Sequence, residues 1–170
     1  FSDKTPPAPV VFDSVTVANG NLAALAWQGS NDSYVVYYRI YRKDNGGFFQ
    51  PIDSISAADH ATSMPWVYAL SNAENESETY LITAVDSCGN QSSVGNTIPS
   101  STIFLNLGVD PCDGYARIRW NTYKEWTQTQ PAAYNLYADI TDPLGGTLTG
   151  VLLKGGNLDT TFNHYGIING

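Results

Sequence analysis

The chain has 170 residues and a formal net charge of −8, from eight basic and sixteen acidic side chains. The basic residues are scattered, whereas a nucleic-acid backbone or an anionic membrane surface is bound by clustered Lys and Arg, so neither is expected as a partner. No run of about 18 apolar residues occurs, which excludes membrane insertion through a spanning helix. Charged residues make up only 14% of the chain, a low share that is typical of all-β surface proteins.

The first half of the chain consists of short β-branched and aromatic runs between turn sequences. After a proline-rich extended segment at residues 4–9, these runs predict strands. Pro51 predicts an edge position for the fourth strand, because proline has no N–H to donate to a neighbouring strand. No window shows the 3.6-residue apolar period of a helix. The predicted strands are residues 10–17, 22–28, 34–42, 48–55, 63–70, 80–86 and 93–98.

The second half repeats the first. Trp27 and Trp120 lie 93 positions apart (120 − 27), and Tyr38 and Tyr134 lie 96 positions apart (134 − 38). A period of this size is one small domain, so the sequence predicts two tandem copies, residues 1–99 and 100–170. The predicted strands of the second copy are residues 102–109, 115–121, 132–140, 147–154 and 161–168.

The second copy is shorter than the first, with 71 residues (170 − 99), although a sandwich of this kind needs about 90–100 residues. Nothing after Thr161 matches the Tyr80-x-Ile82-x-Ala84 pattern of the first copy, so its last two strands are expected to be missing. Two explanations stay open: the chain is cut inside the module, which we favour, or a partner supplies the strands. An open sheet edge favours strand exchange or β-augmentation.

Together these features resemble the fibronectin type III module. Its pattern has prolines before the first strand, a core Trp on the second, Tyr-x-[Ile/Val/Leu] on the third and a Tyr beginning the sixth. The resemblance covers residues 5–99 and continues from Thr102, and it implies two tandem immunoglobulin-like β-sandwiches. The hydroxyl of Tyr80 is expected to bond to upstream backbone as a tyrosine corner. The structural core that the resemblance implies is Trp27, Tyr38, Ile40, Tyr80, Trp120, Tyr134 and Leu136.

A narrower resemblance is to tandem modules of large exported Bacteroidetes proteins associated with gliding motility and type IX secretion. It rests on residues 85–90, on a cysteine in the next module and on Trp120-x-x-Tyr123-x-x-Trp126. It implies an extracellular, cell-surface or periplasmic location and a role as spacer, stalk or adhesive segment. The candidate O-glycosylation sites that it implies are Ser14, Ser54 and Thr160, each of which follows an Asp.

Two pairs of residues are candidates for a site. Tyr123 and Trp126 lie in a polar loop and could form an aromatic platform for a glycan, although packing against the neighbouring module is favoured. Cys88 and Cys112 each lie in a turn-like setting, and their number and placement favour a disulfide over two free thiols. Sandwiches arranged head to tail would hold the two cysteine loops apart, which weakens a bond within the chain.

No motif assembles a reaction centre. The chain has no nucleophile motif, no phosphate-binding glycine loop and no zinc-ligand spacing, so no catalytic residue, metal or cofactor is expected, and His60 and His164 are interpreted as surface histidines. The leading hypothesis is a non-catalytic spacer, adhesion or protein-interaction segment whose partner is a protein or a glycan at the cell surface. The alternative is a carbohydrate-binding accessory module of a secreted polysaccharide-degrading enzyme.

Overall fold

The computed structural model describes residues 4–18, 20–110, 112, 114–123, 133–141 and 144–165. The fold is all-β, with antiparallel sheets as the sequence predicts. The chain divides into two compact units. Unit 1 comprises Phe1–Phe104 with Tyr123–Thr129, and unit 2 comprises Leu105–Thr122 with Gln130–Gly170.

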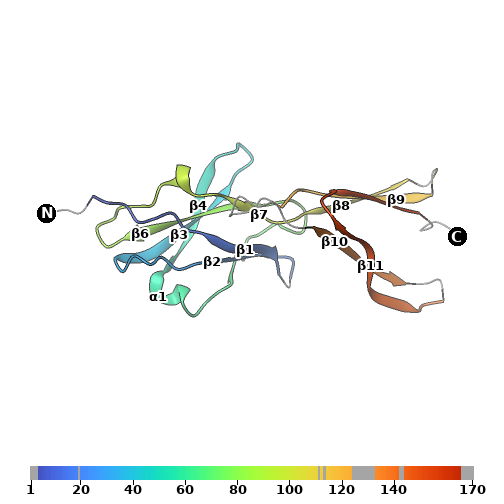
Figure 1. Cartoon of the computed structure of the whole chain (residues 1–170), viewed down its shortest axis with the longest axis horizontal. Helices are drawn as coiled ribbons and strands as arrows, with labels where there is room; N and C mark the ends of the chain where they lie inside the picture. Colours follow the sequence, from blue (N-terminus) through green and yellow to red (C-terminus); the bar gives the residue numbers. More distant parts are fainter. Residues whose placement is uncertain are drawn as a thin grey trace. The chain divides into compact units, whose positions relative to one another are not determined.

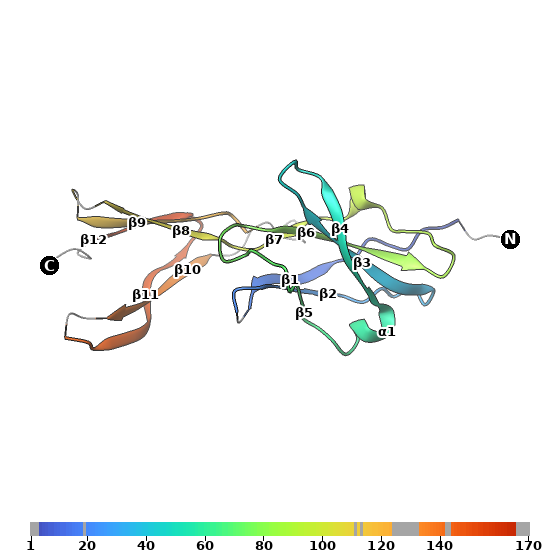
Figure 2. The same cartoon turned by 180° about the vertical axis from the view of Figure 1, so that it is seen from behind.

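Unit 1 is a sandwich of two sheets. The three-stranded sheet has the order β1-β2-β5, from β1 (Phe12–Val17), β2 (Ala23–Trp27) and β5 (Trp66–Val67). The four-stranded sheet has the order β4-β3-β6-β7, from β3 (Val35–Lys43), β4 (Phe49–Ser56), β6 (Thr79–Asp86) and β7 (Ser100–Ser101). Figures 1 and 2 show the two layers from opposite sides. Strand β4, which contains Pro51, is an edge strand, as predicted.

The core of unit 1 lies between its two sheets. Alternate residues of each strand point inward, and the indole of Trp27 is 2% exposed against the ring of Tyr38. Ile40 and Tyr80, which the sequence also placed in the core, are fully buried. The cluster that these residues form continues through Phe12, Val15, Leu25, Ile82 and Ala84.

The described residues of unit 2 form five strands in two sheets. The three-stranded sheet has the order β12-β9-β8, from β8 (Leu105–Asp110), β9 (Tyr115–Trp120) and β12 (Thr161–Tyr165). The second sheet pairs β10 (Tyr134–Thr141) with β11 (Thr147–Asn157). Among the described residues of this unit, Ala116, Ile118 and Leu136 are the buried apolar ones. No strand of these residues corresponds to β6 or β7.

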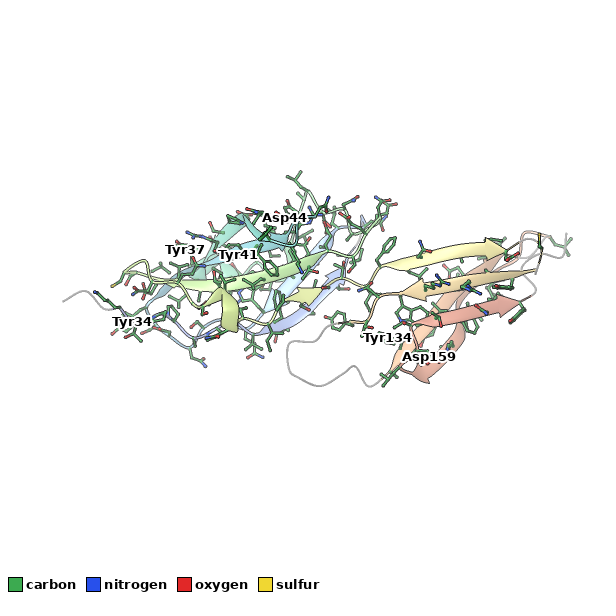
Figure 3. All side chains as sticks on the ribbon, turned by 90° about the horizontal axis from the view of Figure 1, so that it is seen from above. Tyr34, Tyr37, Tyr41, Asp44, Tyr134 and Asp159 are labelled. Carbon is green, nitrogen blue, oxygen red and sulfur yellow. The ribbon has the colours of Figure 1, made fainter. Side chains whose placement is uncertain are left out.

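The internal repeat is visible in side-chain geometry. The ring centroids of Trp27 and Tyr38 lie 5.7 Å apart at an interplanar angle of 72°. The ring centroids of Trp120 and Tyr134 lie 5.8 Å apart, also at 72°, and Figure 3 labels Tyr134. Both pairs join the second strand of a unit to its third, so the same edge-to-face contact holds the two sheets together in each copy.

Two strand predictions are wrong, and one short helix was not predicted. The strand expected at residues 63–70 is reduced to the two residues of β5. The one expected at residues 93–98 is instead a 3₁₀ helix, Val94–Asn96, followed by β7. A one-turn helix that was not predicted, α1 (Ala57–His60), begins where Ser56 Oγ accepts the N–H of Asp59 at 3.0 Å, an N-cap that a periodicity search over longer windows does not detect.

The boundary between the units falls at Phe104, five residues beyond residue 99 (104 − 99). Residues that the sequence assigns to the start of the second copy are buried in unit 1. Ser100 pairs with Tyr80, and the hydroxyl of Thr102 accepts the N–H of Glu78 at 2.9 Å. Short polar side chains are thus used here to close the sheet, although their composition is typical of a linker.

A buried carboxylate lies next to the core of unit 1. Glu78, at 2% exposure, accepts hydrogen bonds from the hydroxyls of Tyr80 (2.6 Å) and Ser71 (2.5 Å) and from the N–H of Asn72 (3.0 Å). The Nε of Arg42 lies 2.9 Å from Glu78 Oε1, the oxygen that also accepts the N–H of Asn72. The tyrosine-corner prediction is therefore wrong in its partner, because Tyr80 donates to a carboxylate and not to upstream backbone.

Candidate functional site

The outer face of the three-stranded sheet of unit 2 carries a set of side chains with recognition chemistry. Ala116 and Ile118 of β9 point into the core, so the alternate residues of β9 point outward. Antiparallel register places outward residues of β8 and β12 beside them. The three rows across the sheet are Asp110–Tyr115–Tyr165, Gly108–Arg117–Asn163 and Asn106–Arg119–Thr161.

The aromatic and guanidinium groups of this face contact one another. Arg117 Nη2 donates to the hydroxyl of Tyr115 at 2.8 Å, and its Cζ lies 5.5 Å from the centroid of the same ring. The rings of Tyr115 and Tyr165 lie 5.5 Å apart at 48°, and Tyr165 is 67% exposed. Stacking and hydrogen bonding hold the Arg117 guanidinium in place, so less conformational entropy is lost when it binds a ligand.

A hollow of about 240 Å³ lies over β8 and β9. Gly108 leaves room for it, since an added Cβ would meet only the carbonyl oxygen of Arg117, at 3.8 Å. The hollow is open and shallow, which suits a polymer lying across the sheet better than an enclosed small molecule. Its lining residues are Asn106, Gly108, Val109, Asp110, Tyr115, Arg117 and Arg119.

Unit 1 shows that the fold does not require these outward residues. Because Trp27 corresponds to Trp120, the positions of Arg119 and Arg117 correspond to Ala26 and Ala24. The same strand of the same module therefore forms with alanine at both positions. The arginines are therefore not needed to form the strand, and they give the outer face of unit 2 charged groups that unit 1 lacks at these positions.

Of the two residues in the sequence-predicted platform, one is described. Tyr123 belongs to unit 1, and its hydroxyl lies on the backbone of Val15 in β1, 3.2 Å from the N–H and 3.3 Å from the carbonyl oxygen. Trp126 lies outside the described residues. The packing contact of Tyr123 accords with the reading that the sequence analysis favoured.

The remaining sequence candidates lie in separate places. Cys88 and Cys112 are free, exposed thiols, one in each unit, and a bond between them stays a prediction. Glycosylation stays a prediction as well: Ser54 is exposed on edge strand β4, while Ser14 and Thr160 are half-buried.

The two histidines are not surface residues of the expected kind. The ring of His60 is half-buried, with its centroid 5.0 Å from Trp27 and 4.9 Å from Tyr38, and its Nε2 lies 3.0 Å from the carbonyl oxygen of Trp27. His164 faces inward from β12, opposite Ala116. Both are packing residues, a role that a lone histidine in a polar segment does not reveal in sequence.

The sequence analysis missed the Tyr115, Arg117 and Arg119 row. The sequence did contain a signal for this face. Large polar residues alternate with apolar ones along the strand, and the first copy has alanine at the positions of the two arginines. Among the described residues, no three His, Cys, Asp or Glu side chains come together in a way that could hold a metal ion. None of the described helices is long and apolar enough to span a membrane.

A scan against protein-family models finds no match to this chain. A search of curated protein sequences finds none either. The site is therefore described from its own geometry alone.

Proposed function

We propose that this chain is a non-catalytic adhesive segment of a secreted or cell-surface protein, built from two fibronectin type III-like modules. The sheet orders β1-β2-β5 and β4-β3-β6-β7 support the likeness, as does the repeated Trp–Tyr contact. Rigid sandwiches suit adhesion because the sheets hold surface side chains in fixed positions. The identity of those side chains can differ from module to module without a change of fold.

The observation that carries the proposal is the face of Tyr115, Arg117, Arg119, Asn163 and Tyr165. Two guanidinium groups at positions i and i+2 present forked donors that match carboxylates. An exposed tyrosine ring offers a flat apolar surface with a polar tip. Amide side chains on either side add donors and acceptors. This combination fits a carboxylate-bearing polysaccharide, a chain of uronic acids, lying across the sheet.

Net charge sets a condition on this binding. The chain is acidic overall, so an acidic polymer is attracted locally by two arginines and repelled at longer range. At physiological ionic strength the screening length is about 8 Å, which removes most of the long-range repulsion and keeps contact-distance hydrogen bonds. Affinity is therefore expected to change little between about 0.05 and 0.15 M salt, unlike that of a basic, phosphate-binding surface.

The test compares binding of polygalacturonate and of an uncharged glucan to the whole chain, measured by calorimetry. The double variant Arg117→Ala and Arg119→Ala, which places the alanines of unit 1 in unit 2, is expected to weaken polygalacturonate binding at least about tenfold, since each charge-assisted hydrogen bond contributes roughly 1.5–3 kcal/mol. Gly108→Val, which fills the hollow, is expected to weaken it as well.

The matched control is Arg39→Ala. Arg39 lies on β3 with its Cζ 5.6 Å from the Tyr37 ring centroid, in a similar tyrosine–arginine arrangement on unit 1, and Figure 3 labels Tyr37. Binding should survive this change. Equal loss in both arginine variants, or no binding of polygalacturonate by the parent chain, would refute the proposal. Tighter binding of the uncharged glucan would favour the accessory module of a polysaccharide-degrading enzyme instead.

A further inference from the structure

Among the described strands, β10 pairs with one neighbour, β11. In unit 1 the corresponding strand, β3, pairs with β4 at one edge and with β6 at the other. In unit 2, β10 pairs with β11. Along residues 136–141, its other edge faces no strand among the described residues. The backbone N–H and carbonyl groups of this edge form a template for another strand.

The same side of unit 2 exposes apolar residues that its counterpart buries. Leu105 and Leu107 lie opposite Trp120 and Ile118, as Phe12 and Val15 lie opposite Trp27 and Leu25. Phe12 is 0% and Val15 is 2% exposed, whereas Leu105 is 47% and Leu107 is 58% exposed. Val109, the next inward residue of β8, is 55% exposed.

The structure of unit 1 identifies what buries these positions. Tyr80, Ile82 and Ala84 point inward from β6 and join one buried cluster with Phe12 and Val15, and β7 extends the same sheet. A β-hairpin on the free edge of the third strand therefore does two things at once. It completes the sheet, and it covers the inner face of the first strand.

We propose that the open edge of β10 accepts a β-hairpin that lies outside these 170 residues and that has the alternating pattern of β6. The register in unit 1 gives its chemistry. Ala84 pairs with Tyr38, Ile82 with Ile40 and Tyr80 with Arg42. On the open part of the edge, the acceptor positions that correspond to Ile40 and Arg42 are Leu136 and Ala138.

One acceptor position sets a preference. Arg42 of unit 1 forms ion pairs with Glu76 and Glu78, and in unit 2 its place is taken by Ala138. The hairpin that fits unit 2 therefore needs no acidic residues before its first strand. It needs a large apolar or aromatic side chain opposite Ala138, because the alanine leaves volume there that Arg42 occupies in unit 1.

The experiment uses a synthetic peptide of residues 77–102 of this chain, with Cys88→Ser, as the probe hairpin. It is added in excess to the whole chain, and hydrogen exchange is measured by mass spectrometry. Amide protection is expected to rise at least tenfold in β10 and to stay unchanged in β3. The same peptide with Ile82→Lys should give no protection. On the chain, Leu107→Lys should abolish the effect, while Leu70→Lys, at an exposed position of unit 1, should not.

A fused form guards against a peptide that fails to fold alone. The same segment is joined behind residue 170 through a Gly/Ser linker, and denaturant unfolding of unit 2 is followed. The fusion is expected to raise its midpoint, and the Ile82→Lys fusion is not. Absence of both effects overturns the proposal. So does sedimentation that shows the chain forming dimers in which β10 is protected without peptide, since a second copy would then be the occupant.

Discussion

Replacing Glu78 by alanine tests whether the buried network, and not only the apolar core, holds unit 1 together. The change removes the acceptor of three hydrogen bonds, from Tyr80, Ser71 and Asn72. It also leaves the Arg42 guanidinium without its buried partner. Breaking a buried charged pair costs about 3–5 kcal/mol. Since small domains have about 5–15 kcal/mol of stability in total, Glu78→Ala is expected to remove a large part of the stability of unit 1.

Glu76→Ala is the matched control, because Glu76 binds the same arginine at 2.9 Å from a half-exposed position. A pair of this kind contributes about 0–1 kcal/mol. Urea unfolding should be followed by NMR intensities of amides in β3 and β6, which report on unit 1 alone. Losses of similar size in the two variants would refute the reasoning, since they would show that burial of Glu78 adds nothing to its contacts.

Three further predictions concern pH and packing. Burial, and then the hydrogen bond to Glu78, raise the pKa of Tyr80 well above its ordinary value. The stability that this hydroxyl contributes is therefore fully present below about pH 10, the ordinary pKa of an unfolded tyrosine, and decreases as pH rises further. The melting temperature should fall above pH 10 in the parent chain and much less in Tyr80→Phe. Hydrogen bonds, first from the Asn90 side chain, lower the pKa of Asp86, so Asp86→Ala should lower the melting temperature at pH 7 but not once the pH has fallen through that pKa. In urea unfolding of alanine variants, Val15→Ala is expected to lower the free energy of unfolding by about 2 kcal/mol, because Val15 is buried. Leu107→Ala is expected to lower it by about 1 kcal/mol or less, although leucine is larger, because Leu107 is 58% exposed.

Much of the fold could be predicted from the sequence because two-residue alternation and turn residues report directly on half-buried strands. The Trp27 and Trp120 strands, the edge position of β4 and the five-strand content of unit 2 follow from such local patterns. The end of unit 1 could not be predicted. The repeat assigns Ser100 and Thr102 to the second copy, and only their contacts with Tyr80 and Glu78 show that they belong to unit 1.

The candidate face could be predicted less well, for a different reason. In the sequence, Arg117 and Arg119 are two charged residues with nothing to mark them. Only the register of β12 against β9 places them on one face of the sheet with Asn163 and Tyr165, about 45 positions later in the chain. Tyr123 shows the opposite case. An aromatic residue in a polar loop left open a ligand platform or packing, of which packing was favoured, and its hydroxyl is bonded to the backbone of Val15.

A duplicated module supplies its own control for separating structure from recognition. Positions that carry equivalent side chains in equivalent contacts, such as the Trp–Tyr pair at 5.7 and 5.8 Å, are explained by the packing that both copies need. Positions where one copy has alanine and the other arginine are not explained by it, because the strand forms in both cases. By the same comparison, Leu107 is apolar in unit 2 where Val15 is buried in unit 1. Leu107 lies at an inward position, so it fits a surface that the hairpin proposed for the edge of β10 would cover. The outer face of β9 points away from that surface, and it is therefore assigned to a different partner, the acidic polysaccharide.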